Sequence, residues 1–172
     1  MFKPVAIVTL FILALTAFAG AQKQRPSPAE QAQCKFSDGK TITVDYSSPR
    51  MKGRKIFGDL VPYGEVWRTG ANDATTFVTT ANVTVGGKSV PAGSYTIFTV
   101  PNQGNWTLIV NKKTGEWGIP YKYEGDELVR VDMKVSQTPS PVENFTIAFD
   151  QACTLTLSWE NTQASVKISG GK

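Results

Sequence analysis

The sequence has no histidine and only two cysteines among its 172 residues. Histidine is the usual base of Ser-His-Asp hydrolases and a common ligand of zinc, copper and haem iron, so its absence removes most members of these classes. The two cysteines, Cys34 and Cys153, are far apart and show none of the close spacings that bind metals. The sequence therefore predicts no metal site and no cofactor.

A strong excess of either charge is absent as well. Lysine and arginine number 18 against 14 aspartate and glutamate residues, which gives a formal net charge of +4. The one local basic cluster is short and runs from Arg50 to Lys55. Because this is a mild excess without a long basic stretch, we expect no nucleic-acid partner.

Long apolar runs are absent except at the N-terminus. There, Lys3 precedes the apolar stretch Val5–Phe18, and the small residues Ala19–Ala21 follow it. This order is typical of a secretory signal peptide, and the stretch is shorter than the roughly 20 residues that span a bilayer. We therefore expect residues 1–21 to be removed on export, with no membrane span in the mature chain and a periplasmic or extracellular location.

Export bears on the two cysteines, because disulfides form and persist in oxidising compartments. Cys34 and Cys153 allow one intramolecular pairing, which would join the first strand region to the last. In the chain-entropy model, so long a loop would stabilise the fold by roughly 4–5 kcal/mol. The alternative is a pair of free buried thiols.

Alternating apolar and polar residues predict strands through most of the chain. Clear examples are "KTITVDY" (Lys40–Tyr46), "ENFTIAFD" (Glu143–Asp150) and "CTLTLSW" (Cys153–Trp159). No stretch of ten or more residues shows a clean helical period, and no glycine-rich nucleotide-binding loop precedes a helix. The pattern predicts an all-β fold, an antiparallel β-sandwich of about eight or nine strands.

The expected domain organisation is simple. After the signal peptide, residues 22–33 are polar and contain prolines, which predicts a flexible leader with at most one helical turn at Ala29–Gln33. Residues 34–169 are expected to form a single β-sandwich domain, since this length is enough for one hydrophobic core.

Residues 47–74 interrupt the strand pattern. The stretch "LVPYGEVWRTGANDAT" (Leu60–Thr75) alternates neither like a strand nor like a helix. Irregular segments of this length in compact domains are usually functional or disordered, and its many apolar residues argue against disorder. We expect an ordered insertion that covers one end or edge of the sandwich, with one or two helical turns near Lys55–Val61.

The same segment carries a family resemblance. The strings "YSSPRMKGRKIFGDLVPYGEVWRTGANDATTF", "GGKSVPAGSYTIFTVP", "WTLIVNKKTGEWG" and "LSWENTQASVKI" resemble the secreted bacterial family DUF2911, over about Cys34–Ile168. The resemblance implies an exported bacterial domain, one β-sandwich, and no particular activity, because the family is one of unknown function. Asp73 stands where the family usually has glutamate.

Several polar and aromatic residues in and near the insertion are candidates for a ligand site. Arginine presents a planar fork suited to carboxylate or phosphate, and tryptophan offers a flat face to rings and sugars. The candidate ligand-binding residues are Arg54, Trp67, Arg68, Asn72, Asp73 and Trp117.

Four of the candidates also have a structural alternative. Arg68 and Asp73 could form a salt bridge that fixes the loop, Trp67 could be a core residue, and Arg54 could belong to a solvated surface. The other two tryptophans, Trp106 and Trp159, lie on predicted strands, and we expect them in the core.

Three functions remain open from the sequence. The favoured one is a binding module for a small polar, anionic or glycan ligand, and the alternative is a structural or protein-interaction domain of the cell envelope. The third is a hydrolase with two carboxylates from among Glu65, Asp73 and Glu116, which would have to lie about 5–10 Å apart in an open cleft. No spacing in the sequence indicates such a pair, so a non-enzymatic role is favoured and no catalytic residue is assigned.

Overall fold

The computed structural model describes residues 26–171, in which nine strands and one 3₁₀ turn occur. The predicted signal peptide and the first part of the leader lie outside the described residues. The strands are β1 (Ala29–Lys35), β2 (Thr41–Ser47), β3 (Thr76–Thr79), β4 (Val83–Val85), β5 (Lys88–Val90), β6 (Gly93–Val100), β7 (Asn105–Asn111), β8 (Glu127–Phe149) and β9 (Thr154–Gly170).

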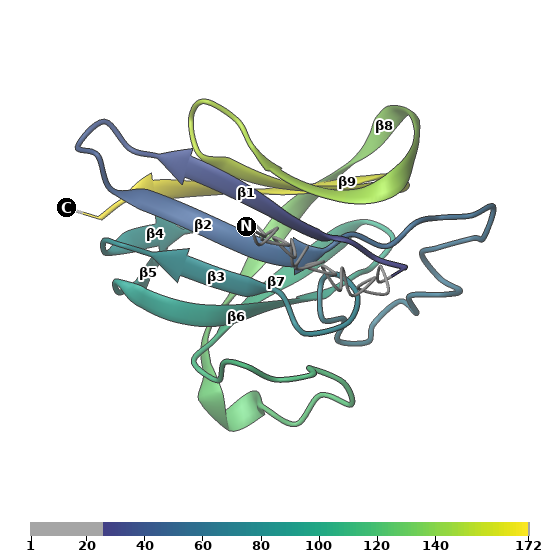
Figure 1. Cartoon of the computed structure of the whole chain (residues 1–172), viewed down its shortest axis with the longest axis horizontal. Coiled ribbons are helices and arrows are strands. Elements are labelled where there is room, and N and C mark those ends of the chain that lie inside the picture. The colour runs from purple at the N-terminus through teal and green to yellow at the C-terminus, as the bar shows by residue number, and fades with distance from the viewer. Residues whose placement is uncertain (1–25, 172) are drawn as a thin grey trace, which may run out of the picture.

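The strands form one antiparallel sheet in the order β1-β2-β3-β6-β7-β8-β9-β4-β5 (Figure 1). The all-β class and the antiparallel pairing are confirmed. Separate sheets of a sandwich are not shown within residues 26–171, and the sheet is not closed, because its two edge strands pair on one side only.

The length of β8 and β9 explains the single sheet. The strand predicted at Glu143–Asp150 is, up to Phe149, only the last part of the 23-residue strand β8. Its first part pairs with β7 and its later part with β9, and the register with β9 shifts between Gln137 and Thr146. Such irregularities bend a strand without ending it, so the β8–β9 ribbon curves over the sheet (Figure 1). Edge strands β1 and β5 both contact β8.

The core lies on the concave side of this curved sheet, and the alternating residues place it there. In β2, Ile42, Val44 and Tyr46 are buried, whereas the residues between them face outward. In β9, Leu155 and Leu157 are buried in the same way. Successive side chains of a strand point to opposite faces, so this alternation gives β2 and β9 one apolar face each.

Two local expectations were wrong. The 29–33 stretch, assigned to the leader, belongs to β1 because it pairs with β2 over its whole length. The Lys55–Val61 stretch contains no helical turn but makes a bridge between Phe57 and Val61. Gly58 between them has a φ of 84°, which is a left-handed conformation that interrupts a right-handed helix. The one 3₁₀ turn of the described part lies at Glu124–Asp126.

The predicted disulfide is confirmed between Cys34 of β1 and Cys153, which directly precedes β9. The two Cα atoms are 5.7 Å apart and 119 residues separate the two positions. Both cysteines are buried. The bond holds edge strand β1 near the start of β9, and it points to folding in an oxidising compartment.

Within residues 26–171, no helix is long and apolar enough to cross a bilayer.

We predict that replacing both cysteines, as Cys34→Ala with Cys153→Ala, lowers the free energy of unfolding by roughly 3–5 kcal/mol, because the unfolded chain regains the entropy of the open loop. Guanidinium denaturation followed by tryptophan fluorescence measures the change. The unmutated protein treated with a reducing agent should show the same loss. Equal stability of the oxidised and cysteine-free proteins would contradict this account of the bond.

Candidate functional site

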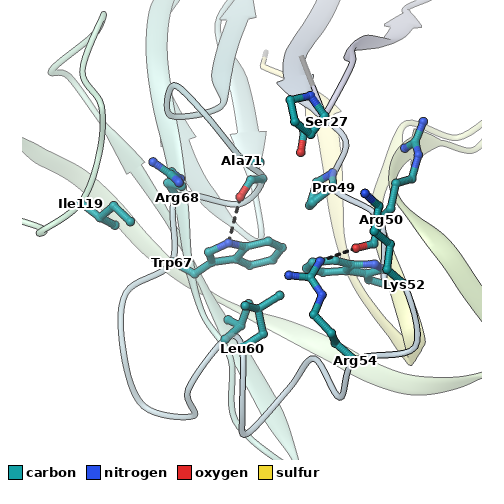
Figure 2. A pocket seen from close by; sticks show the side chains of 14 residues that line it. Ser27, Pro49, Arg50, Lys52, Arg54, Leu60, Trp67, Arg68, Ala71 and Ile119 are labelled. Carbon is teal, nitrogen blue, oxygen red and sulfur yellow. Dashed lines mark hydrogen bonds between the residues drawn. The ribbon is translucent and has the colours of Figure 1, made fainter. Parts of the chain in front are cut away.

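The connecting segment, residues 48–75 between β2 and β3, forms one wall of a pocket at the end of the curved sheet. The pocket has a volume of about 600 Å³. Pro26 and Ser27 line it from the N-terminal side, and Ile119 lines it from the loop between β7 and β8 (Figure 2). With Trp159 of β9, four stretches that are distant in sequence meet here.

Two stacked tryptophans contribute to this pocket. Trp67 of the connecting segment lies against Trp159 of β9, with ring centroids 5.9 Å apart and an interplanar angle of 17°. Trp67 is also fixed by its backbone, which exchanges hydrogen bonds with Thr99 of β6, and by Phe145, whose ring meets it edge to face at 4.9 Å. Both residues line the pocket although both are buried, so Trp67 is a core residue and a pocket residue at once.

The turn that follows Trp67 is held in a strained conformation. Thr69 has a φ of 57°, which is unusual for a β-branched residue and costs about 1–3 kcal/mol. Hydrogen bonds surround it, because the Trp67 Nε1 donates to the Gly70 carbonyl oxygen at 3.1 Å and the Thr75 hydroxyl donates to the Thr69 carbonyl oxygen at 2.7 Å. Backbone strain that the surrounding hydrogen bonds hold in place is common at binding sites.

Four cationic side chains line the pocket, and no carboxylate does. In Figure 2, Lys52 and Arg54 lie on one side of Trp67 and Arg68 lies on the other. The ion pairs found within residues 26–171 join Lys40 to Asp38, Lys113 to Glu116, and Arg130 to Glu127. None of them involves a cation of the pocket. The site is therefore positive, with an apolar floor.

Backbone carbonyls orient the cations of the 50–54 turn. The Arg54 Nε donates to the Met51 carbonyl oxygen at 3.0 Å, and its Nη2 donates to the Arg50 carbonyl oxygen at 2.6 Å. Arg50 is itself held, because its Nη1 donates to the carbonyl and hydroxyl oxygens of Ser48. A guanidinium has five N–H donors, so Arg54 keeps further donors for a ligand.

Arg68 is positioned by the loop that follows β7. Its guanidinium carbon lies 4.6 Å from the centroid of the Trp117 ring, a cation–π contact, and its Nη1 donates to the Trp117 carbonyl oxygen at 3.4 Å. Partial burial lowers the pKa of the Arg68 guanidinium, and the negative charge of Asp73 opposes this shift. Arg68 is thus a partly desolvated cation at the pocket wall.

The sequence candidates fall into two groups. Arg54, Trp67 and Arg68 line the pocket, whereas Asn72, Asp73 and Trp117 do not. Trp117 contacts Arg68, Asp73 acts on the charge of Arg68, and the Asn72 amide donates to the Ser27 carbonyl oxygen at 3.2 Å. These three residues therefore act on the pocket through residues that line it.

Sequence reasoning missed part of the lining. The pocket residues outside the candidate set include Arg50, Lys52, Leu60, Ile119 and Trp159. The basic cluster was a usable signal for the first two. Trp159 follows the same alternation as core residues, and Ile119 reaches the pocket only through the tertiary fold.

The site thus defines an all-β protein with an open, positively charged pocket that has aromatic residues at its base. The family described as "protein of unknown function (DUF2911)" matches residues 27–168, and the chain belongs to it. No curated protein and no solved structure matches this chain.

We predict that Gly118→Ala destabilises the protein by about 2–4 kcal/mol, because an added Cβ would lie 2.8 Å from the Ala74 Cβ and 3.1 Å from the Arg68 Cβ. Gly115→Ala is the matched control, since Gly115 also has a positive φ but open space around it. It should cost about 1–2 kcal/mol. Urea denaturation measures both values, and equal losses would mean that Gly118 does not pack tightly against Arg68.

Proposed function

We propose that this protein is an exported binding module for a small organic anion with a flat or apolar body. The observation that carries the proposal is the convergence of Lys52, Arg54 and Arg68 around a tryptophan floor, in a pocket without a carboxylate. Arginine binds carboxylate and phosphate through charge-assisted hydrogen bonds, which are about twice as strong as neutral ones.

The apolar lining indicates what the rest of the ligand is. Leu60 and Ile119 line the pocket and keep 45% and 40% of their surfaces exposed, which is unusual for large aliphatic residues. A ligand with an apolar body would remove this surface from water, and that transfer is favourable. The combination therefore favours an aromatic or aliphatic carboxylate over a small inorganic anion.

The other candidate functions have less support at this pocket. A glycan usually stacks on an open aromatic face, whereas Trp67 is 9% exposed and lies against Trp159. A carboxylate-dependent hydrolase needs two acids in one cleft, and Glu65, Asp73 and Glu116 are all outside the lining.

Two observations support export. The disulfide requires an oxidising compartment to persist, and Met1–Ala21 has the order of charged, apolar and small residues that a signal peptide has. We infer a periplasmic or extracellular location in a bacterium.

An envelope protein is the second candidate for the occupant. Trp117 is 54% exposed and contacts Arg68, so the apolar rim extends beyond the pocket itself. An acidic segment with apolar side chains would complement this rim and the cations together. Such a partner would bury Trp117, whereas a small molecule confined to the pocket would not.

We predict that benzoate, indole-3-acetate or octanoate binds the protein, and that the matching neutral amide binds at least about tenfold more weakly, because it lacks the charge that the arginines recognise. Arg54→Ala should weaken binding of the acid by about tenfold or more for the same reason. Isothermal titration calorimetry measures each affinity.

The matched control is Lys55→Ala, because Lys55 is the exposed neighbour of Arg54 and does not line the pocket. Its effect should stay within about twofold, as is usual for an exposed charge. Binding of none of the three acids, equal affinity for acid and amide, or an equal effect of the two substitutions would each refute an anion site at this pocket.

A further inference from the structure

A second pocket, of about 510 Å³, differs from the first in having no charged lining. It lies between Phe57 and Tyr63 of the connecting segment, the turn between β6 and β7, and the β8–β9 ribbon. The residues that line it are Phe57, Tyr63, Asn102, Gln103, Gly104, Trp106, Val135, Ser136, Gln137, Asn161 and Thr162. Amide and hydroxyl side chains therefore surround a partly aromatic base.

The amide groups of this pocket are uncommitted within the described part of the chain. The side chains of Asn102, Gln103, Gln137 and Asn161 make no hydrogen bond to another residue of the 26–171 range. Asparagines with structural roles elsewhere behave differently. The Asn111 amide donates to the Tyr121 hydroxyl and the Tyr123 carbonyl oxygen, and the Asn72 amide donates to the Ser27 carbonyl oxygen. These four amide groups lie at one opening, and each can still donate and accept hydrogen bonds.

Tyr63 gives this opening an aromatic wall of fixed position. Its ring lies directly over Gly58, where an added Cβ would come within 2.7 Å of the Tyr63 Cε2. Tyr63 as a whole remains 39% exposed. A half-exposed aromatic ring of fixed orientation can contact the C–H face of a sugar and keeps a hydroxyl for hydrogen bonding.

Trp106 forms the buried aromatic base of this pocket. Its Nε1 is the one buried side-chain nitrogen or oxygen within residues 26–171 that lacks a hydrogen-bond partner, and it is closed to solvent. A ligand at the base would therefore contact the Trp106 ring and not its N–H group, and the indole signal can report on that contact.

We propose that the second pocket is a site for a neutral saccharide. Sugar hydroxyls both donate and accept, as the four amides do, and the absence of charged lining disfavours an ionic ligand. The anion pocket plays no part in this argument, so either site can fail without the other.

The test is a titration of the ¹⁵N-labelled protein with maltose, cellobiose and N,N′-diacetylchitobiose, followed by ¹H–¹⁵N correlation spectra. At least one disaccharide should shift the Trp106 indole signal and the side-chain amide signals of Asn102, Gln137 and Asn161 in a saturable way. Gln137→Ala combined with Asn161→Ala should weaken binding about tenfold, because two hydrogen-bonding groups are lost. Both residues are exposed, so the fold should persist.

Two controls make the outcome decisive. Asn105→Ala removes a neighbouring exposed amide that does not line the second pocket, and Arg54→Ala alters the first pocket; neither should change the affinity for the disaccharide. No saturable shift with any of the three sugars would overturn the proposal. Shifts confined to Trp67 and Arg68, or binding that is indifferent to the double substitution, would overturn it as well.

Discussion

The contact between Trp67 and Trp159 anchors the connecting segment to the sheet. It joins a residue of an irregular segment to a residue of the longest hairpin of the sheet, at a centroid distance of 5.9 Å. Phe57 adds edge-to-face contacts to both rings of this pair, and Phe145 meets Trp67 edge to face and Trp159 at a tilt. Because the segment has no regular secondary structure, these rings and the bridge from Trp67 to Thr99 fix where its polar residues lie. Ring packing thus fixes the position of the connecting segment, as backbone hydrogen bonds between strands fix the position of a strand.

Because Trp67 is anchored, several cationic side chains lie close together at the pocket. Fixing Trp67 brings the 50–54 turn and Arg68 to opposite sides of one opening, so cations converge over apolar rings. Like charges near a low-dielectric surface repel one another more strongly than in water. Backbone carbonyls and the Trp117 ring offset part of this cost. An anion would reduce this repulsion further, which is why we propose a binding site here and not a purely structural lid.

The sequence predicted more of the fold than of the candidate site. Alternation in β2 and β9 identified the strands, since one buried face leaves a period of two, and the cysteine pair could be joined in only one way. Alternation does not say which strands pair, so the single sheet and the continuous β8 were not foreseen. The density of polar and aromatic residues in an irregular segment singled out Arg54, Trp67 and Arg68, which line the first pocket. Ile119 carries no comparable local signal, and Trp159 looks like any other buried strand residue.

The most direct test of the account is a crystal structure of the protein with 4-bromobenzoate, in which anomalous scattering locates the bromine. We expect the carboxylate within hydrogen-bonding distance of Arg54 or Arg68, the ring against Trp67 and the bromine near Leu60 or Ile119. An acid found at another surface, or one whose carboxylate points away from these arginines, would contradict the central claim that the tryptophan pair organises an anion site.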